Sequence, residues 1–138
     1  VGRLDYDTSG LLILTNDGDF TYSLTHPKHE IDKVYIAQIE GVPSKESLYK
    51  FRNGLEIDGY TTAPAKIQIL KSRANTSLIE VIIHEGKNRQ VRKMCDAIGH
   101  SVRSLKRVAI GSLELGNLQE GRWRHLKQEE VKRLIEMH

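Results

Sequence analysis

The sequence opens with VGRLDYDTSGLLILTNDGD at residues 1–19, and this stretch predicts how the rest of the fold is arranged. A run of four aliphatic residues at 11–14 stands between Gly10 and the turn signal of residues 16–18. An apolar run bounded in this way is typical of a short buried strand. We therefore predict a strand at 11–14 that anchors the preceding acidic loop to the core.

The acidic loop carries two carboxylates, Asp5 and Asp7, close to Arg3. A carboxylate that a rigid scaffold holds beside a core strand is well placed for chemistry. Asp and Thr in a loop also accept backbone hydrogen bonds in turns, and Asp7 with Thr8 fits that structural role. The residues alone leave both interpretations open.

Length and composition predict a single globular domain. A chain of 138 residues can bury a substantial core, and its 38% hydrophobic and 28% charged residues are typical of a globular protein. No apolar run approaches the roughly 20 residues of a membrane helix, and no signal peptide is visible. We expect no membrane partner.

The chain has one cysteine, Cys95, which cannot form an internal disulfide. No paired Cys and His spacing of the zinc-binding type is present, so we expect no metal and a reducing, cytoplasmic setting. The net charge of +3 and a pI near 9.0 make nucleic acid a plausible partner. The first residue is Val1, and we expect the chain to be a fragment or a truncated form of a longer protein.

The middle of the chain predicts short helices and strands in irregular order, which favours an α+β fold. The expected elements are a short helix after Asp19, a strand at Lys33–Glu40, a helix of about ten residues between Pro43 and Gly54, a turn at Asp58 and Gly59, paired strands at 66–71 and 77–84, and a final helix from about Gln128 with Val131, Leu134 and Ile135 inward. We expect a mixed, largely antiparallel central sheet flanked by helices.

A second polar stretch, EGKNRQVRKMCDAIG at residues 85–99, predicts a tight turn at Gly86 followed by a helix. Its apolar face comprises Val91, Met94, Cys95 and Ile98, and its other face carries Arg89, Arg92 and Lys93 with Lys87 at the start. A solvated basic face would explain these cations. Crowded cations with few acids also suit phosphate contacts, and the amides of Asn88 and Gln90 can hydrogen-bond bases or sugars.

The last third of the chain extends the basic character. SVRSLKRVAIGSLEL at residues 101–115 alternates apolar positions with Arg103, Lys106 and Arg107. A turn and short strand are expected between Gly116 and Leu126, where Trp123 is read as a core anchor, with a base-stacking platform as the alternative.

Three blocks of this sequence resemble the ribosomal RNA pseudouridine synthases, in the branch typified by the small-subunit enzyme A and the large-subunit enzyme B. The blocks are GRLD with TSGLLILTNDG, the Lys-x-Tyr of the strand at 33–40, and the Gln-aliphatic-Arg of the basic helix, followed by Leu105, Arg107, Ile110 and Gly111. The resemblance implies a mixed sheet around an active-site cleft. It also implies that part of the catalytic domain and a small RNA-binding domain precede the single catalytic domain of residues 1–138.

The resemblance assigns roles to three residues. Asp5 matches the essential catalytic aspartate, Tyr35 the tyrosine that packs against the target base, and Arg92 the basic residue that forms an ion pair with the aspartate. We therefore expect Asp5 and Arg92 to touch. Phosphate contacts are expected from Arg3, Lys87, Arg89, Lys93, Arg103 and Arg107, which should give salt-dependent binding.

The expected function is isomerisation of a specific uridine in ribosomal RNA to pseudouridine, without cofactor or metal. One alternative is an RNA-binding fragment without catalytic activity. A third is hydrolysis of a sugar or ester by Asp5 and Asp7 as a pair, which requires both carboxyl groups to face one cleft.

Overall fold

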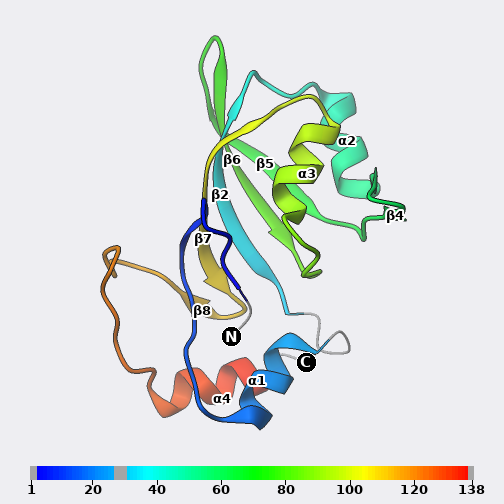
Figure 1. Ribbon diagram of the computed structural model, residues 1–138. Helices are drawn as coiled ribbons and strands as arrows, with labels where there is room; N and C mark the ends of the chain where they lie inside the picture. Colours follow the sequence, from blue (N-terminus) through cyan, green and yellow to red (C-terminus); the bar gives the residue numbers. More distant parts are fainter. Residues whose placement is uncertain (1–2, 27–30, 137–138) are drawn as a thin grey trace.

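The computed structural model describes residues 3–26 and 31–136, and within them one main sheet has helices on one face and at one end (Figure 1). The elements in chain order are β1 (Ser9–Gly10), α1 (Gly18–Thr25), β2 (Lys33–Glu40), α2 (Lys45–Asn53), β3 (Glu56–Ile57), β4 (Tyr60–Thr61), β5 (Lys66–Ser72), β6 (Thr76–Ile83), α3 (Gln90–Ala97), β7 (Val102–Ile110), β8 (Leu113–Glu114) and α4 (Gln128–Glu136). The predicted α+β class is confirmed.

The main sheet has the strand order β1-β7-β2-β6-β5, with β8 paired to β7. Its pairs are antiparallel except for β1 with β7, which run parallel. The prediction of a mixed, largely antiparallel sheet is therefore confirmed. The parallel pair matters most for function, because it attaches the start of the chain to the middle of β7.

Helices α2 and α3 cover one face of this sheet (Figure 1). The buried residues between them form one hydrophobic cluster, made of Ala37, Ile39, Phe51, Ile67, Ile79, Val81, Ile83, Val91, Met94, Cys95 and Leu105. The alternation of β6 explains its side of the cluster, because Ile79, Val81 and Ile83 are buried at every second position. Helix α3 contributes Val91, Met94 and Cys95, as its periodicity predicted.

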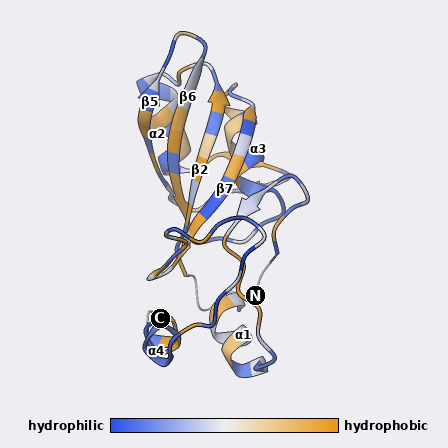
Figure 2. Ribbon diagram, turned by 90° about the vertical axis from the view of Figure 1, so that its left-hand side faces the viewer, coloured by the Kyte–Doolittle hydropathy of each residue, from blue (hydrophilic) through white to orange (hydrophobic). Residues whose placement is uncertain are grey.

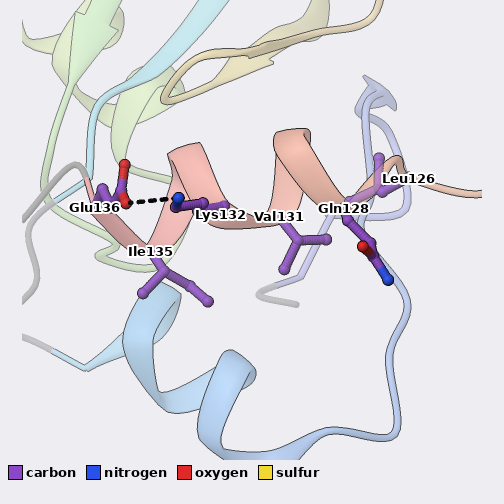
Figure 3. Close-up of a pocket in the computed structure, with 6 residues that line it drawn as sticks. All are labelled: Leu126, Gln128, Val131, Lys132, Ile135 and Glu136. Carbon is purple, nitrogen blue, oxygen red and sulfur yellow. Dashed lines mark ion pairs between the residues drawn. The ribbon is translucent and has the colours of Figure 1, made fainter.

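Helices α1 and α4 pack at one end of the sheet, away from α2 and α3, in both overall views (Figure 2). They share a second cluster made of Leu11, Ile13, Phe20, Leu24, Ile31, Ile110, Leu113 and Leu134. In Figure 3, Val131 and Ile135 point from α4 towards α1 and line a hollow of about 340 Å³. Leu134 is buried as predicted, whereas Ile135 points towards α1 but remains 43% exposed, so its predicted inward position holds in direction and not in burial.

The predicted strand at 11–14 is wrong in its position. The strand β1 is Ser9–Gly10, and after it the backbone N–H of Leu11 donates to the carbonyl of Arg107 at 2.8 Å. Beyond that point the chain leaves the sheet edge. Leu11 and Ile13 are buried whereas Leu12 and Leu14 are exposed, so the run has one apolar face in the core instead of two.

Other local predictions also need correction. The helix predicted after Asp19 begins earlier, at Gly18, and the side chain of Asp17 caps it by accepting from two backbone N–H groups. The left-handed residue before α3 is Arg89, with a φ of 50°, and not Gly86. No strand forms between Gly116 and Leu126, which are all described residues. Trp123 is 76% exposed, its ring nearly perpendicular to that of His125, and it is not a core anchor.

Candidate active site

The loop before β1 is fixed to the sheet by backbone contacts. The N–H of Thr8 donates to the carbonyl of Asp5 at 3.0 Å and closes a turn, and Gly10 then pairs with Arg107 of β7. Gly10 has a φ of 115°, and an added Cβ would lie 2.2 Å from the carbonyl oxygen of Arg107. Only glycine fits this crossing, which holds the Asp5 loop close to the sheet.

Arg89 links the loop to the start of α3. Its Nη1 and Nη2 donate to the two carboxylate oxygens of Asp7 at 2.9 and 2.8 Å. Its Nη1 also lies 3.8 Å from Oδ2 of Asp5. One guanidinium therefore serves two carboxylates, tightly on Asp7 and loosely on Asp5. The hydrogen bond from Arg89 lowers the pKa of Asp7, and the positive charge of Arg92 adds to the effect.

Arg92 contacts Asp7, and the predicted contact between Asp5 and Arg92 is wrong. The Nε of Arg92 lies 3.4 Å from Oδ1 of Asp7, and its Nη2 donates to the backbone carbonyl of Asp7 at 2.6 Å. Arg89 immediately precedes α3 and Arg92 lies in its first turn, and both side chains reach the loop. Arg89, at the N-terminal end, reaches Asp5, while Arg92, one turn later, meets the backbone around Asp7 and Thr8.

Tyr35 lies on β2, level with Gly10 at the end of the Asp5 loop in the register of the sheet. β7 stands between β1 and β2, and its Arg107 is the register partner of both Gly10 and Tyr35. Neighbouring strands lie about 4.8 Å apart, so the backbones of Gly10 and Tyr35 are separated by roughly 10 Å. Tyr35 is half-buried and packs against the cluster beneath α3.

The side chain of Arg107 is buried, which contradicts its predicted role as a surface phosphate contact. It is 3% exposed, and its Nε donates to the carbonyl of Leu11 at 2.9 Å. Its position on the inner side of β7, between β1 and β2, removes it from solvent. Arg107 therefore braces the segment that follows the Asp5 loop.

The other predicted cations are dispersed and mostly paired. Lys93 forms an ion pair with Asp58 of the β3–β4 turn, and Arg103 pairs with Glu40 at 3.1 Å. The ammonium of Lys87 lies 5.3 Å from the centre of the Tyr60 ring. Arg3 is exposed. The positive face inferred from α3 is thus largely neutralised by acids that lie elsewhere in the sequence.

Gln90 is buried and belongs to a structural network, so it does not present its amide to a ligand. Its Nε2 donates to Oε1 of Glu85 at 2.9 Å, and the same oxygen accepts from the N–H of Ala63 at 2.7 Å. Its own carbonyl accepts from the N–H of Lys87 at 3.3 Å. These hydrogen bonds hold the turn before α3 in place, and that turn positions Arg89 beside the Asp5 loop.

The arrangement suits a carboxylate that acts alone beside a cation. The side chain of Asp5 is 34% exposed and makes no tighter ion pair than the one with Arg89 among the described residues. A hydrolytic pair of Asp5 and Asp7 needs one protonated acid. Asp7 is held by two guanidinium groups that lower its pKa, so it would be the ionised member of such a pair, and the pair hypothesis stays a prediction.

Residues 3–26 and 31–136 contain no group of three or more His, Cys, Asp or Glu side chains arranged to hold a metal ion. Their helices are too short and too polar to span a bilayer.

Sequence reasoning missed Asp7 as the main partner of both arginines. The only signal in the sequence was its spacing, two residues from Asp5 in a turn-rich loop. It also missed Asp58 and Glu40, which neutralise Lys93 and Arg103, because those pairs are 35 and 63 residues apart.

A family model for RNA pseudouridylate synthases matches residues 1–97. The chain belongs to the RNA pseudouridylate synthase family. The matched range includes the Asp5 loop, the Tyr35 strand and the arginines of α3, which the fold brings to one region. The family predicted from the three sequence blocks is confirmed.

Curated relatives in this family are similar over most of the chain. A ribosomal large subunit pseudouridine synthase B from Bacillus subtilis (strain 168) is 53% identical over 136 residues, which cover 97% of this chain and 56% of the relative. A ribosomal large subunit pseudouridine synthase E from Vibrio parahaemolyticus is 39% identical, over 91% of this chain and 59% of the relative. The chain thus spans little more than half the length of these relatives.

Solved structures support the same family fold. A crystal structure of a pseudouridylate synthase superimposes with a TM-score of 0.89 at 36% identity, covering 96% of this chain and 57% of that one. The archaeal box H/ACA sRNP Nop10-Cbf5 complex contains a chain with a TM-score of 0.60 at 21% identity, which shows a shared fold only.

Proposed function

We propose that this protein converts uridine to pseudouridine in large-subunit ribosomal RNA, with Asp5 as the catalytic carboxylate. The observation that carries the proposal is the position of Asp5 within the family motif, on a rigid turn and 3.8 Å from the guanidinium of Arg89. The substrate class follows from the names of the relatives from Bacillus subtilis and Vibrio parahaemolyticus.

The reaction breaks the N1–C1′ bond of uridine and forms a C5–C1′ bond, with loss of the proton on C5 and gain of one on N1. The isomerisation needs no oxidant or reductant, so we propose that no cofactor takes part. A carboxylate can trap or stabilise the sugar at C1′ while the uracil rotates. The side chain of Asp5 is partly exposed, so a sugar could reach it.

Tyr35 is proposed to pack against the target base. Tyr35 packs against the cluster to which α3 contributes, and its register partner Arg107 is also that of Gly10. The target uridine would have to leave its stack to reach Asp5 and Tyr35 together. Lys87 and Arg3 are the proposed phosphate contacts, because both are exposed.

We also propose that residues 1–138 form one catalytic domain of a longer enzyme, because the similarity to the longer relatives extends over almost the whole chain. A cytoplasmic location is proposed because ribosomal RNA is the proposed substrate.

The experiment measures tritium release from large-subunit ribosomal RNA transcripts labelled at C5 of uridine, with the wild-type protein and with Asp5→Asn. We expect release and pseudouridine formation by the wild type and loss of at least about 10³-fold in the variant, in line with removal of a covalent catalyst. Asp19→Asn, an exposed carboxylate of α1, is the matched control and should retain wild-type turnover.

Equal product from the wild type and Asp5→Asn would reject the catalytic assignment. RNA binding by both proteins without tritium release would instead support the alternative of a catalytically inactive RNA-binding module.

A further inference from the structure

The carboxylate of Asp7 pairs with Arg92, which sequence reasoning assigned to Asp5, and also with Arg89, which it assigned to phosphate contacts. Both of its oxygens accept from Arg89, at 2.9 and 2.8 Å, and Oδ1 also lies 3.4 Å from Nε of Arg92. Asp5, in contrast, is only 3.8 Å from Arg89. The bidentate geometry is the stronger of the two kinds of contact, so Asp7 determines where the Arg89 guanidinium lies.

The backbone of Arg89 limits where its guanidinium can move. Its backbone is left-handed, with a φ of 50°, and the neighbouring Gln90 is buried and bonded to Glu85. The guanidinium of Arg89 has a defined direction, because its backbone is constrained and both Nη atoms donate to the carboxylate of Asp7. The distance from Arg89 to Asp5 therefore follows from Asp7.

The position of Arg92 also depends on Asp7. Its Nη2 donates to the Asp7 carbonyl at 2.6 Å and lies 3.5 Å from the hydroxyl of Thr8. The side chain of Arg92 is 13% exposed, so its charge is held largely away from water and needs the adjacent carboxylate. Asp7 thus joins α3 to the turn that carries Asp5.

We infer that Asp7 is a positioning residue for the proposed pseudouridine synthase reaction: it fixes Arg89 beside Asp5 and leaves the oxygens of Asp5 free of a close hydrogen bond. An Asp5 carboxylate clamped by a bidentate arginine would have both oxygens occupied. The arrangement keeps a positive charge near Asp5 and keeps its oxygens available to the sugar. This inference rests on the proposed function.

The test compares kcat and KM of wild type, Asp7→Asn, Arg89→Lys and the double variant on unmodified large-subunit ribosomal RNA transcripts. We expect Asp7→Asn to lower kcat about 10- to 100-fold, because a displaced catalytic group costs about that much, with KM changed by less than about twofold. Because Asp7 acts through Arg89, the double variant should be no slower than the slower single variant. Asp7→Glu keeps the charge and should recover part of the lost kcat.

Asp58→Asn is the matched control. It removes one carboxylate that pairs with Lys93 on the same helix, but it does not touch the Asp5 loop. The kcat of Asp58→Asn should equal that of the wild type. The control therefore distinguishes the loss of any ion pair to α3 from the specific loss of Asp7.

Several outcomes would overturn the inference. A raised KM with unchanged kcat in Asp7→Asn would show that Asp7 affects RNA binding only. Additive losses in the double variant would show that Asp7 acts independently of Arg89. An inactive wild type would reject the proposed function and this inference with it, whereas an active wild type, an inactive Asp5→Asn and a fully active Asp7→Asn would reject the inference alone.

Discussion

The carboxylate of Asp7 makes the stability of the candidate site dependent on pH. Hydrogen bonding by Arg89 lowers its pKa in the folded protein below the ordinary value of 3.8. As the pH falls, the unfolded chain therefore takes up the proton before the folded one does. The stabilisation by Asp7 is complete above the unfolded pKa and is lost as the pH falls through the folded pKa.

We expect Asp7→Asn to be less stable than the wild type at neutral pH, because the asparagine cannot form the charged pairs with Arg89 and Arg92. The difference in the free energy of unfolding between the two proteins should disappear at a pH well below 3.8, where Asp7 is protonated in both the folded and the unfolded chain. Urea denaturation across this pH range measures it. A constant difference at every pH would contradict the assignment.

Cys95 gives a second prediction for a single residue. It is 0% exposed in the main cluster, and burial raises the pKa of its thiol to about 12. Since the thiolate is the reactive form, a disulfide reagent should react with the native protein at least about 100-fold more slowly than with the urea-unfolded chain at mildly alkaline pH. Equal rates would mean that the cluster around Cys95 opens readily.

At the scale of elements, the two-residue strand β1 determines where the Asp5 loop lies. Its Gly10 crosses Arg107 so closely that a Cβ would lie 2.2 Å from the Arg107 carbonyl oxygen. Arg107 in turn bonds the carbonyl of Leu11 through its side chain. A strand of this length is stable only because both its backbone and the next residue are tied to β7.

We expect Gly10→Ala to destabilise the fold by about 2 kcal/mol or more, because it combines a positive φ of 115° with a backbone clash. Gly18→Ala is the control: Gly18 lies in the first turn of α1 with nothing within 4 Å of its Cβ position. That change should leave stability equal or raise it by up to about 1 kcal/mol. Thermal unfolding of both variants measures the effect, and equal melting temperatures would refute the close crossing.

At the scale of the whole molecule, internal ion pairs reduce the positive charge available to the proposed RNA substrate. Lys93 and Arg103 are paired with Asp58 and Glu40, and Arg89 with Asp7. Similar pairing occurs far from the site, where Arg124 lowers the pKa of Glu130 to about 2 through a hydrogen bond. The net charge of the chain is only +3, and many of its cations are held in ion pairs. A few exposed cations should therefore decide how RNA binding responds to salt.

We expect affinity for ribosomal RNA transcripts to fall as salt rises, with a log–log slope that becomes shallower by about 0.7 to 0.9 in Lys87→Gln. Lys87 is exposed near the loop that precedes α3, whereas Lys132 lies on α4 and pairs with Glu136. Lys132→Gln is the control and should keep the wild-type slope. Filter binding or fluorescence anisotropy from low to moderate salt gives the slope for each variant. An equal change of slope in Lys87→Gln and Lys132→Gln would contradict a phosphate contact at Lys87.

Regular elements with a clear hydrophobic period were predicted well. The strand at Lys33–Glu40 has the predicted bounds, and α2 lies between Pro43 and Gly54 as expected. The buried face of α3 was also predicted. These elements are determined by local alternation and by residues that begin and end helices, which act over a few positions.

Irregular segments were predicted poorly. The run at 11–14 is a single-faced extended segment and not a buried strand, and Trp123 is exposed. Whether such a residue is covered depends on which distant surface the chain places against it. Local sequence does not carry that information.

The sequence by itself determined the α+β elements, the largely antiparallel sheet and, through its motifs, the pseudouridylate synthase family. Only the tertiary structure decided that Asp7 takes the arginines and that Arg107 is buried. Periodicity and turn residues act over a few positions, and motifs are read directly from the chain. Ion pairs between residues more than 80 positions apart depend instead on strand register, helix phase and the backbone angles of Gly10 and Arg89.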